Sequence, residues 1–210
     1  MPEFRLLADD PLEHALPAGR SGAADGAPGV VAEWRSHMSL IALTVRRGQD
    51  DALAESLRRR YGLDLPNGPR RAVSGSTALV GIGSGRWLFI QETDDPSGLA
   101  ATLAEALGAH AAIVDQSDSR AVLRLTGPLL RAVLAKGLPI DLHPDRFGPN
   151  DTATSVIALI NIQLWQIEAP PGIEIAVPRS YAGSFAAWLT ASAAEFGLEF
   201  RAPLGKTGVR

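Results

Sequence analysis

The order of strand and helix patterns along this 210-residue chain repeats once, and the repeat limits the possible folds more than any other feature. In the first half, the apolar run at residues 40–45 predicts a strand. A helix follows, which we expect to be capped by Asp50 or Asp51 and to end at Gly62. Two strands and a second helix then complete the half, which reads strand, helix, strands, helix.

A hairpin is expected in the middle of the first half. Strand-like residues 78–82 and 87–91 flank the glycine-rich connection at 83–85. Closely spaced glycines also occur in phosphate-binding loops, but such loops lead directly into a helix, whereas a strand follows here. The pattern therefore favours a hairpin. The next helix is expected to stop at Gly108, where a left-handed residue is easiest for glycine.

The second half follows the same order. Residues 120–125 predict a strand, Pro128 a helix start and Gly137 its end. Strand-like runs at 154–168 and 173–177 precede a helix that begins near Ser184. We therefore predict an α+β fold made of duplicated ferredoxin-like βαββα halves related by a pseudo-twofold axis, preceded by an extended N-terminal arm.

The predicted organisation has four parts. Residues 1–36 contain a small, flexible, glycine- and alanine-rich stretch and cannot build a core alone, so they form either a disordered tail or an arm bound to a partner. Residues 37–112 and 113–203 are the two α+β halves, and residues 204–210 are a C-terminal tail.

Composition excludes several functional classes. The formal net charge of -3 is too small to favour nucleic acid as a partner. Neither a run of 18 or more apolar residues nor a signal peptide is visible, so we expect a cytoplasmic protein that does not span the membrane. Cysteine is absent, and the four histidines lack the spacing of paired metal ligands on a helix. These absences exclude thiolate catalysis, iron–sulfur clusters and a histidine-rich metal site.

Two polar clusters stand out between the strands of the second half. Asp115, Asp118 and Arg120 could bind a ligand, or they could satisfy backbone groups in a turn between strands, which is the reading we favour. Asp141, His143 and Arg146 lie in a loop framed by prolines. Histidine beside carboxylates suits acid–base work, but no nucleophile stands nearby, so we favour a loop that contacts a partner.

Four tryptophans divide by their surroundings. Trp87 and Trp188 fit core positions, whereas Trp34 and Trp165 are candidates for contact with another chain, since tryptophan is enriched at interfaces. Arg179 follows a strand end, where its guanidinium could reach a partner carboxylate or remain a solvated charge.

Several of these segments carry a family resemblance. The polar run 115–120, followed by a strand, a Gly127-Pro128 helix start and the segment Leu138-Pro139-Ile140-Asp141-Leu142-His143-Pro144, resembles the gamma subunit of bacterial heterotetrameric sarcosine oxidase. The segments 164–166 and 175–185 agree with it. This resemblance covers roughly residues 40–200 and implies a fold similar to the folate-binding module of the glycine-cleavage T-protein.

The resemblance also implies a function. The enzyme demethylates sarcosine oxidatively to glycine with tetrahydrofolate and O2, giving 5,10-methylenetetrahydrofolate and H2O2. In that family the alpha and beta subunits carry FAD, FMN, NAD and the folate site, and the delta subunit carries zinc. The resemblance thus implies that the gamma subunit serves assembly and that this chain has no catalytic, cofactor-binding or metal-binding residues. Alternatives are a stand-alone folate-binding or one-carbon transfer protein, and the equivalent subunit of an N-methylglutamate dehydrogenase.

Overall fold

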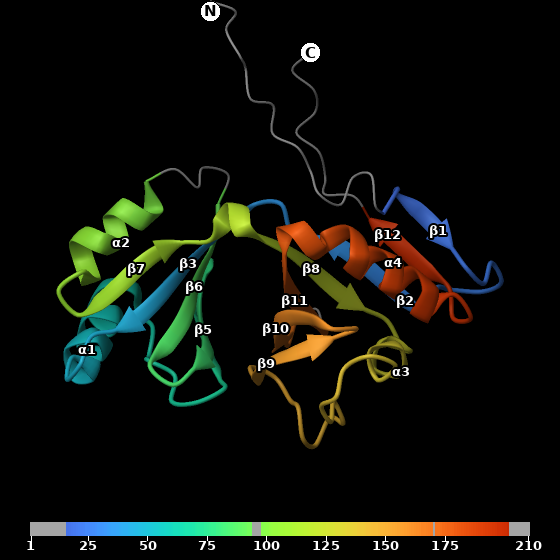
Figure 1. The fold of residues 1–210 in the computed structure, drawn as a ribbon. Coiled ribbons are helices and arrows are strands. Elements are labelled where there is room, and N and C mark those ends of the chain that lie inside the picture. The colour runs from blue at the N-terminus through green and yellow to red at the C-terminus, as the bar shows by residue number, and fades with distance from the viewer. Residues whose placement is uncertain (1–15, 94–97, 170, 202–210) are drawn as a thin grey trace, which may run out of the picture.

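Two β-sheets pack face to face in the computed structural model, which describes residues 16–93, 98–169 and 171–201. Helices cover the outer face of each sheet, so the described chain has four layers in the order helices, sheet, sheet, helices (Figure 1). This arrangement is α+β, as the sequence predicts.

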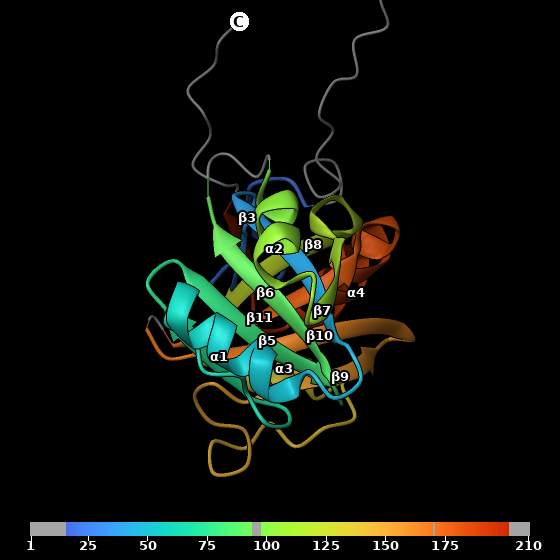
Figure 2. The ribbon, with the colours of Figure 1, turned by 90° about the vertical axis from the view of Figure 1, so that its left-hand side faces the viewer.

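The first sheet has five strands, and every neighbouring pair is antiparallel. Helices α1 (Asp50–Tyr61) and α2 (Leu99–Leu107) cover its outer face, as Figure 2 shows. Across the sheet the strands run in the order β4 (Arg71–Ser74), β5 (Thr77–Gly83), β6 (Arg86–Glu92), β3 (Met38–Val45) and β7 (Ala111–Asp115).

The second sheet has seven strands, antiparallel except for the pair β12 and β2. Helices α3 (Leu130–Leu134) and α4 (Ala182–Ala193) cover its outer face. The short helix η1 (Ser117–Ser119) connects the sheets and η2 (Arg179–Tyr181) precedes α4. The strand order is β1 (Gly19–Ser21), β12 (Leu198–Arg201), β2 (Val30–Trp34), β8 (Arg120–Thr126), β11 (Gly172–Pro178), β10 (Ile160–Ile167) and β9 (Thr152–Ile157).

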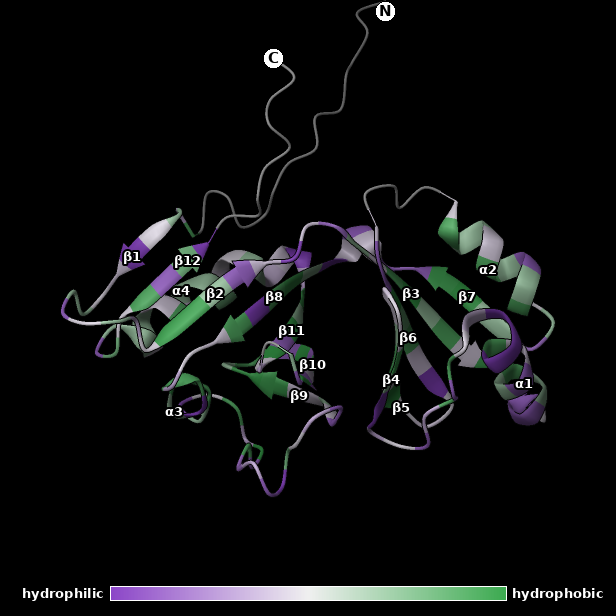
Figure 3. Cartoon of the chain, turned by 180° about the vertical axis from the view of Figure 1, so that it is seen from behind, coloured by the Kyte–Doolittle hydropathy of each residue, from purple (hydrophilic) through white to green (hydrophobic). Residues whose placement is uncertain are grey.

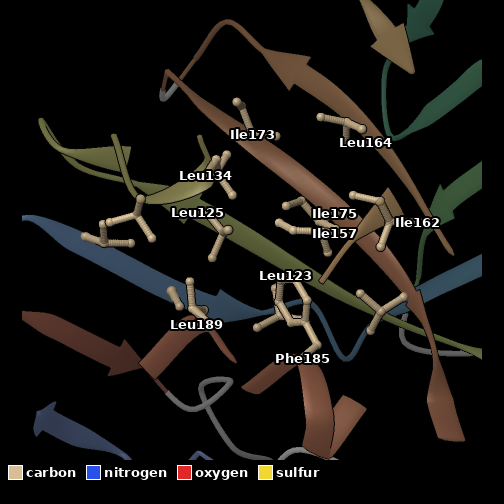
Figure 4. Close-up of a cluster of buried hydrophobic side chains, with 14 of the residues drawn as sticks. Leu123, Leu125, Leu134, Ile157, Ile162, Leu164, Ile173, Ile175, Phe185 and Leu189 are labelled. Carbon is tan, nitrogen blue, oxygen red and sulfur yellow. The ribbon is translucent and has the colours of Figure 1, made fainter. Parts of the chain in front are cut away.

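Three buried clusters fill the spaces between the layers because alternate residues of each strand point to opposite faces. In β8, Leu123 and Leu125 point toward α3 and α4, where they pack with Phe185 and Leu189 (Figure 4). A second cluster lies between the first sheet and its helices. The third joins the two sheets, and Trp165 at its centre is fully buried.

The N-terminal segment takes part in this packing. Strand β2 lies between β8 and β12 and pairs with both, and its residues Val30 and Ala32 have no exposed surface. Within residues 16–36, the strands β1 and β2 of the expected arm therefore belong to the chain's own sheet. Residues 1–15 and the tail 204–210 lie outside the described residues. The expected boundary at residues 112 and 113 falls inside β7, which pairs with β3.

The helix ends test the sequence-based predictions. Gly62 ends α1 in the left-handed conformation at φ 63°, as expected. Asp50 and Asp51 lie in the first turn of α1 and make no side-chain cap, so the predicted capping is wrong. Their carboxylates instead lie near the positive end of the helix dipole. Gly108 ends α2 but has φ -62°, so its predicted left-handed conformation is also wrong.

One predicted strand region contains an unexpected turn. Residues 154–168 read as a single strand-like run, but the structure breaks the run at Ala158 and Leu159, between β9 and β10. Neither residue is typical of turns, which explains why the sequence pattern missed it.

Within the described residues, no helix is long and apolar enough to span a bilayer. Hydrophilic residues make up much of α1 (Figure 3). Its buried Leu53 and Leu57 belong to the apolar cluster between the first sheet and its helices.

Candidate functional site

A buried ion pair lies between the two sheets. Glu174 of β11 is 2% exposed. Its neighbour across the strands, Arg124 of β8, donates two hydrogen bonds to Glu174 Oε1, from Nε at 2.9 Å and Nη2 at 2.7 Å. From β10 on the other side, Trp165 Nε1 donates to Glu174 Oε2 at 2.6 Å. Both carboxylate oxygens therefore have donors, which offsets much of the cost of burying the charge.

Arg35, just after β2, connects this pair to the other sheet. Its Nη2 donates to Glu92 Oε1 of β6 at 2.6 Å, and its Nε lies 3.5 Å from Glu174 Oε1. Burial lowers the pKa of Arg35, but the carboxylates of Glu92 and Glu174 outweigh burial and raise the pKa overall. The guanidinium therefore links carboxylates from both sheets.

Arg71 of β4 borders a small cavity beside the same cluster. The cavity has a volume of about 90 Å³ and is also lined by Glu92, Trp165 and Glu174. Arg71 Nε is buried without a hydrogen-bond acceptor. Burial lowers the pKa of Arg71, and the nearby carboxylate of Glu174 offsets only part of this decrease. The volume corresponds to roughly three water molecules, so the cavity is too small for a pterin or a flavin. The charged residues around it suit a structural link between the sheets.

A larger open hollow, about 790 Å³, lies beside the glycine-rich connection. This connection is a hairpin between β5 and β6, as predicted. The hollow is lined by Asp50, Asp51 and the stretch 65–69, and its described lining contains no lysine or arginine. Phosphate groups bind where positive charge and free N–H groups gather. Two carboxylates in place of cations therefore disfavour a nucleotide here.

The Asp115 segment forms the predicted turn. Asp115 Oδ1 accepts hydrogen bonds from the backbone N–H of Ser117 at 2.9 Å and from its hydroxyl at 2.7 Å. Ser117 Oγ also accepts a hydrogen bond from the backbone N–H of Leu40 at 3.0 Å, which attaches the turn to β3. Burial lowers the pKa of Arg120. The polar run thus satisfies backbone groups where the chain passes between the sheets.

The proline-framed loop is anchored from inside. Leu142 and Phe147 are each 6% exposed and belong to the core of the second half. Arg131 of α3 donates from Nε to the Leu142 carbonyl at 2.7 Å. Asp141, just before the first anchor, and Arg146, just before the second, are exposed to solvent. The loop is therefore a fixed, charged surface feature.

His143 takes part in local bonds of this loop. Its backbone N–H donates to Asp141 Oδ1 at 2.9 Å, and its Nδ1 accepts from the backbone N–H of Asp145 at 3.3 Å. Its side chain is 63% exposed and lies 3.5 Å from the Asp145 carboxylate. These bonds are those of a turn, and the imidazole lines neither of the two cavities described above.

The remaining candidates lie apart from that loop. Trp34 is partly buried against the core of the second half, and Arg179 is partly buried at the start of η2. The prediction that Trp165 contacts another chain is corrected by its position. It has no exposed surface and donates a hydrogen bond to Glu174, so it is a core residue and not a surface anchor. Trp87 is buried as predicted, and Trp188 packs 5.8 Å from the Phe185 ring.

The sequence interpretation missed the charged cluster between the sheets. Glu174, Arg124 and Arg71 lie far apart in the chain, and only the sheets bring them together. One signal was present, because Glu174 interrupts the apolar strand Ile173–Val177. A carboxylate in a strand buried on both faces needs a cation partner.

Comparison with known proteins connects this fold to one enzyme. A model of the "Sarcosine oxidase, gamma subunit family" matches residues 46–195. Two curated relatives are sarcosine oxidase gamma subunits. The Arthrobacter sp. protein is 32% identical over 165 residues, covering 78% of this chain and 79% of the relative. The protein of Corynebacterium sp. strain U-96 is 30% identical, covering 76% and 78%.

Solved structures agree with these sequence matches. A chain of heterotetrameric sarcosine oxidase from Corynebacterium sp. U-96, in complex with pyrrole 2-carboxylate, superposes with a TM-score of 0.77 at 29% identity, covering 91% of this chain and 97% of that one. The glycine cleavage system aminomethyltransferase T of Bartonella henselae shares the fold, with a TM-score of 0.57 at 20% identity over 82% of this chain and 48% of that chain. With the family model matching residues 46–195, this chain is a member of the sarcosine oxidase gamma subunit family.

Proposed function

We propose that this chain is the gamma subunit of a heterotetrameric sarcosine oxidase and that its role is assembly, not catalysis. The observation that carries the proposal is the match to a chain of the Corynebacterium enzyme, which extends over 97% of that chain. Among the described residues, the buried charge of Glu174 is used inside the fold: it pairs with Arg124 within the seven-stranded sheet, and Arg35 links it to Glu92 of the other sheet. Such a chain contributes a rigid surface to a complex.

The chemistry belongs to the other subunits in this proposal. Alpha, beta and delta subunits are the partners, and they carry FAD, FMN, NAD, tetrahydrofolate and zinc. The whole complex, in the cytoplasm, converts sarcosine, tetrahydrofolate and O2 to glycine, 5,10-methylenetetrahydrofolate and H2O2. The surface of this chain that meets these partners includes Trp34, the loop residues Asp141, His143 and Arg146, and Arg179.

We further propose that the two halves arose by duplication of a ferredoxin-like unit. The chain order β3, α1, β4, β5, β6, α2, β7 corresponds to β8, α3, β9, β10, β11, α4, β12. Across the sheets, the order β4-β5-β6-β3-β7 corresponds to β9-β10-β11-β8-β12, with β2 inserted before β12. On this account the N-terminal segment is an addition to the second copy.

Expression of the remaining subunits with and without this chain tests the assembly role. With the chain, we expect a heterotetramer that forms H2O2 from sarcosine. Without it, we expect loss of the intact complex or faster thermal inactivation. A complex of equal stability and turnover that forms without the chain would contradict the proposal. Saturable tetrahydrofolate binding by the isolated chain would instead favour a folate-binding protein.

A further inference from the structure

The turn between β9 and β10 has an unusual backbone for its residues. Ile157 pairs with Ile160, so Ala158 and Leu159 are the two central residues of a tight hairpin. Both have positive φ, 48° and 70°. A two-residue turn of this kind is normally built from Asn and Gly. Gly has no Cβ atom, and the short polar side chain of Asn can hydrogen-bond locally, whereas the left-handed conformation is unfavourable for other residues with a Cβ atom. The chain therefore has two residues in an unfavourable backbone conformation at positions where Asn and Gly, which adopt it at lower energy, are common.

The Leu159 side chain gains nothing from folding of the chain itself. It is 95% exposed, whereas Ile157 and Ile160 beside it are 0% and 5% exposed. A single exposed leucine is ordinary on a protein surface. A leucine that is fully exposed and also holds a left-handed backbone is not explained by folding, because Asn or Gly would remove both disadvantages.

The turn is held in place. The backbone N–H of Ala158 donates to the carbonyl of Gly137, just after α3, at 3.3 Å. The turn is thus attached to the body of the second half through both buried isoleucines and this bond. A backbone held in this way loses little conformational entropy on binding, which favours association through the residue at its tip.

The surroundings of the turn extend the apolar surface. Strand β9 is the last strand of the seven-stranded sheet (Figure 1). Along it, Thr154 lines the large hollow and Val156, on the same face two residues later, is 39% exposed. The exposed row Thr154, Val156 and Leu159 therefore leads from the hollow to the tip of the hairpin.

Building on the proposed subunit role, we propose that Leu159 inserts into an apolar pocket on another subunit of the heterotetramer, with Val156 at the edge of the contact. The occupant is a different subunit because the similar solved assembly is a heterotetramer. A side chain that is fully desolvated in a well-packed pocket near the centre of an interface can carry much of the binding energy. The strain in the free chain is the cost of presenting it.

Four versions of the full-length tagged chain, each co-expressed with the remaining subunits, test this contact: wild type, Leu159→Asn, Leu159→Met and Ala158→Asn. We expect Leu159→Asn to weaken retention of the other subunits by at least about tenfold. The isolated Leu159→Asn chain should melt about 1 to 3 °C higher, because Asn tolerates the left-handed backbone. Leu159→Met and Ala158→Asn both keep an apolar residue at the tip and should assemble as wild type does.

The outcomes separate this contact from the subunit role. If the wild-type chain recovers no other subunit, the proposed function fails and the contact with it. If wild type and Leu159→Asn recover the other subunits equally, only the contact is wrong. Equal weakening by Ala158→Asn would assign the effect to the turn and overturn the role of the leucine. If the isolated wild-type chain forms a dimer that Leu159→Asn loses, while heterotetramer assembly stays normal, Leu159 contacts a second copy of this chain. That result would also overturn the proposed contact with another subunit.

Discussion

Glu174 lies in a strand whose other residues are apolar and, except for Pro178 at its end, buried, and it is stable there because both neighbouring strands supply donors. Arg124 neutralises the charge from β8, and Trp165 completes the bonding from β10. Arg35 then adds a link to Glu92 in the other sheet. At the scale of single residues, the two sheets are held together by a polar cluster inside an apolar layer.

Replacement of Glu174 tests the importance of this cluster. Glu174→Gln leaves Arg124 and Arg35, which are 17% and 18% exposed, without their buried counter-charge. We expect the free energy of unfolding to fall by about 1 to 3 kcal/mol, measured by urea denaturation. Glu92→Gln is the matched control, since Glu92 is 50% exposed and should cost less than about 1 kcal/mol. Equal losses for the two variants would show that burial of Glu174 is unimportant.

Gly137 offers a second test at this scale. The sequence marks it as a helix end, but its φ is not positive, and a Cβ there would lie 2.8 Å from the Trp188 ring. We expect Gly137→Ala to lower the free energy of unfolding by about 1 to 3 kcal/mol through overpacking. Gly183 in α4 is the control, because a Cβ there meets nothing within 4 Å. Gly183→Ala should stabilise the chain by up to about 1 kcal/mol, and a stabilising Gly137→Ala would contradict the contact with Trp188.

Most elements could be predicted from local patterns. The strand at 40–45, the helix ended by Gly62 and the glycine hairpin all depend on neighbouring residues, and the structure confirms them. The turn at Ala158 and Leu159 was missed because neither residue has turn chemistry. The pairing of β2 with β8 and β12 joins segments far apart in the chain, and a pattern of one segment does not determine such partners.

The interior position of β2 leads to a test at the scale of elements. Ala32 has no exposed surface and lies at the centre of this strand. Ala32→Asp buries a carboxylate without a partner, so we expect the free energy of unfolding to fall by about 4 kcal/mol or more in thermal or urea denaturation. Ser36→Asp, at an exposed position just after the strand, should change it by less than about 0.5 kcal/mol. Equal stability of both variants would place β2 outside the core.

For the whole molecule, the sequence predicts one of the two polar regions, the proline-framed loop, and not the other. Asp141, His143 and Arg146 do share one exposed loop, because the prolines and the buried Leu142 and Phe147 are close in sequence. The charged cluster between the sheets could not be predicted from neighbouring residues. It requires the tertiary packing of two sheets whose residues come from both halves of the chain.

Charge reversal in the exposed loop tests its role in the assembly. We expect Arg146→Glu to slow association with the other subunits by about tenfold at low salt, with a smaller effect at high salt. Thermal melting of the isolated chain should not change, since Arg146 is exposed. Arg59→Glu, an equal charge change on the exposed side of α1, is the control. Equal slowing by both variants would assign the effect to net charge and not to the loop.

We propose that this chain functions inside a larger flavoenzyme. The most direct measurement is gentle purification of the tagged full-length chain from its own host, followed by native mass, flavin absorbance and sarcosine-dependent H2O2 formation. We predict recovery of a heterotetramer that contains flavin and oxidises sarcosine. A colourless chain that elutes alone and shows no sarcosine-dependent H2O2 formation would contradict the claim.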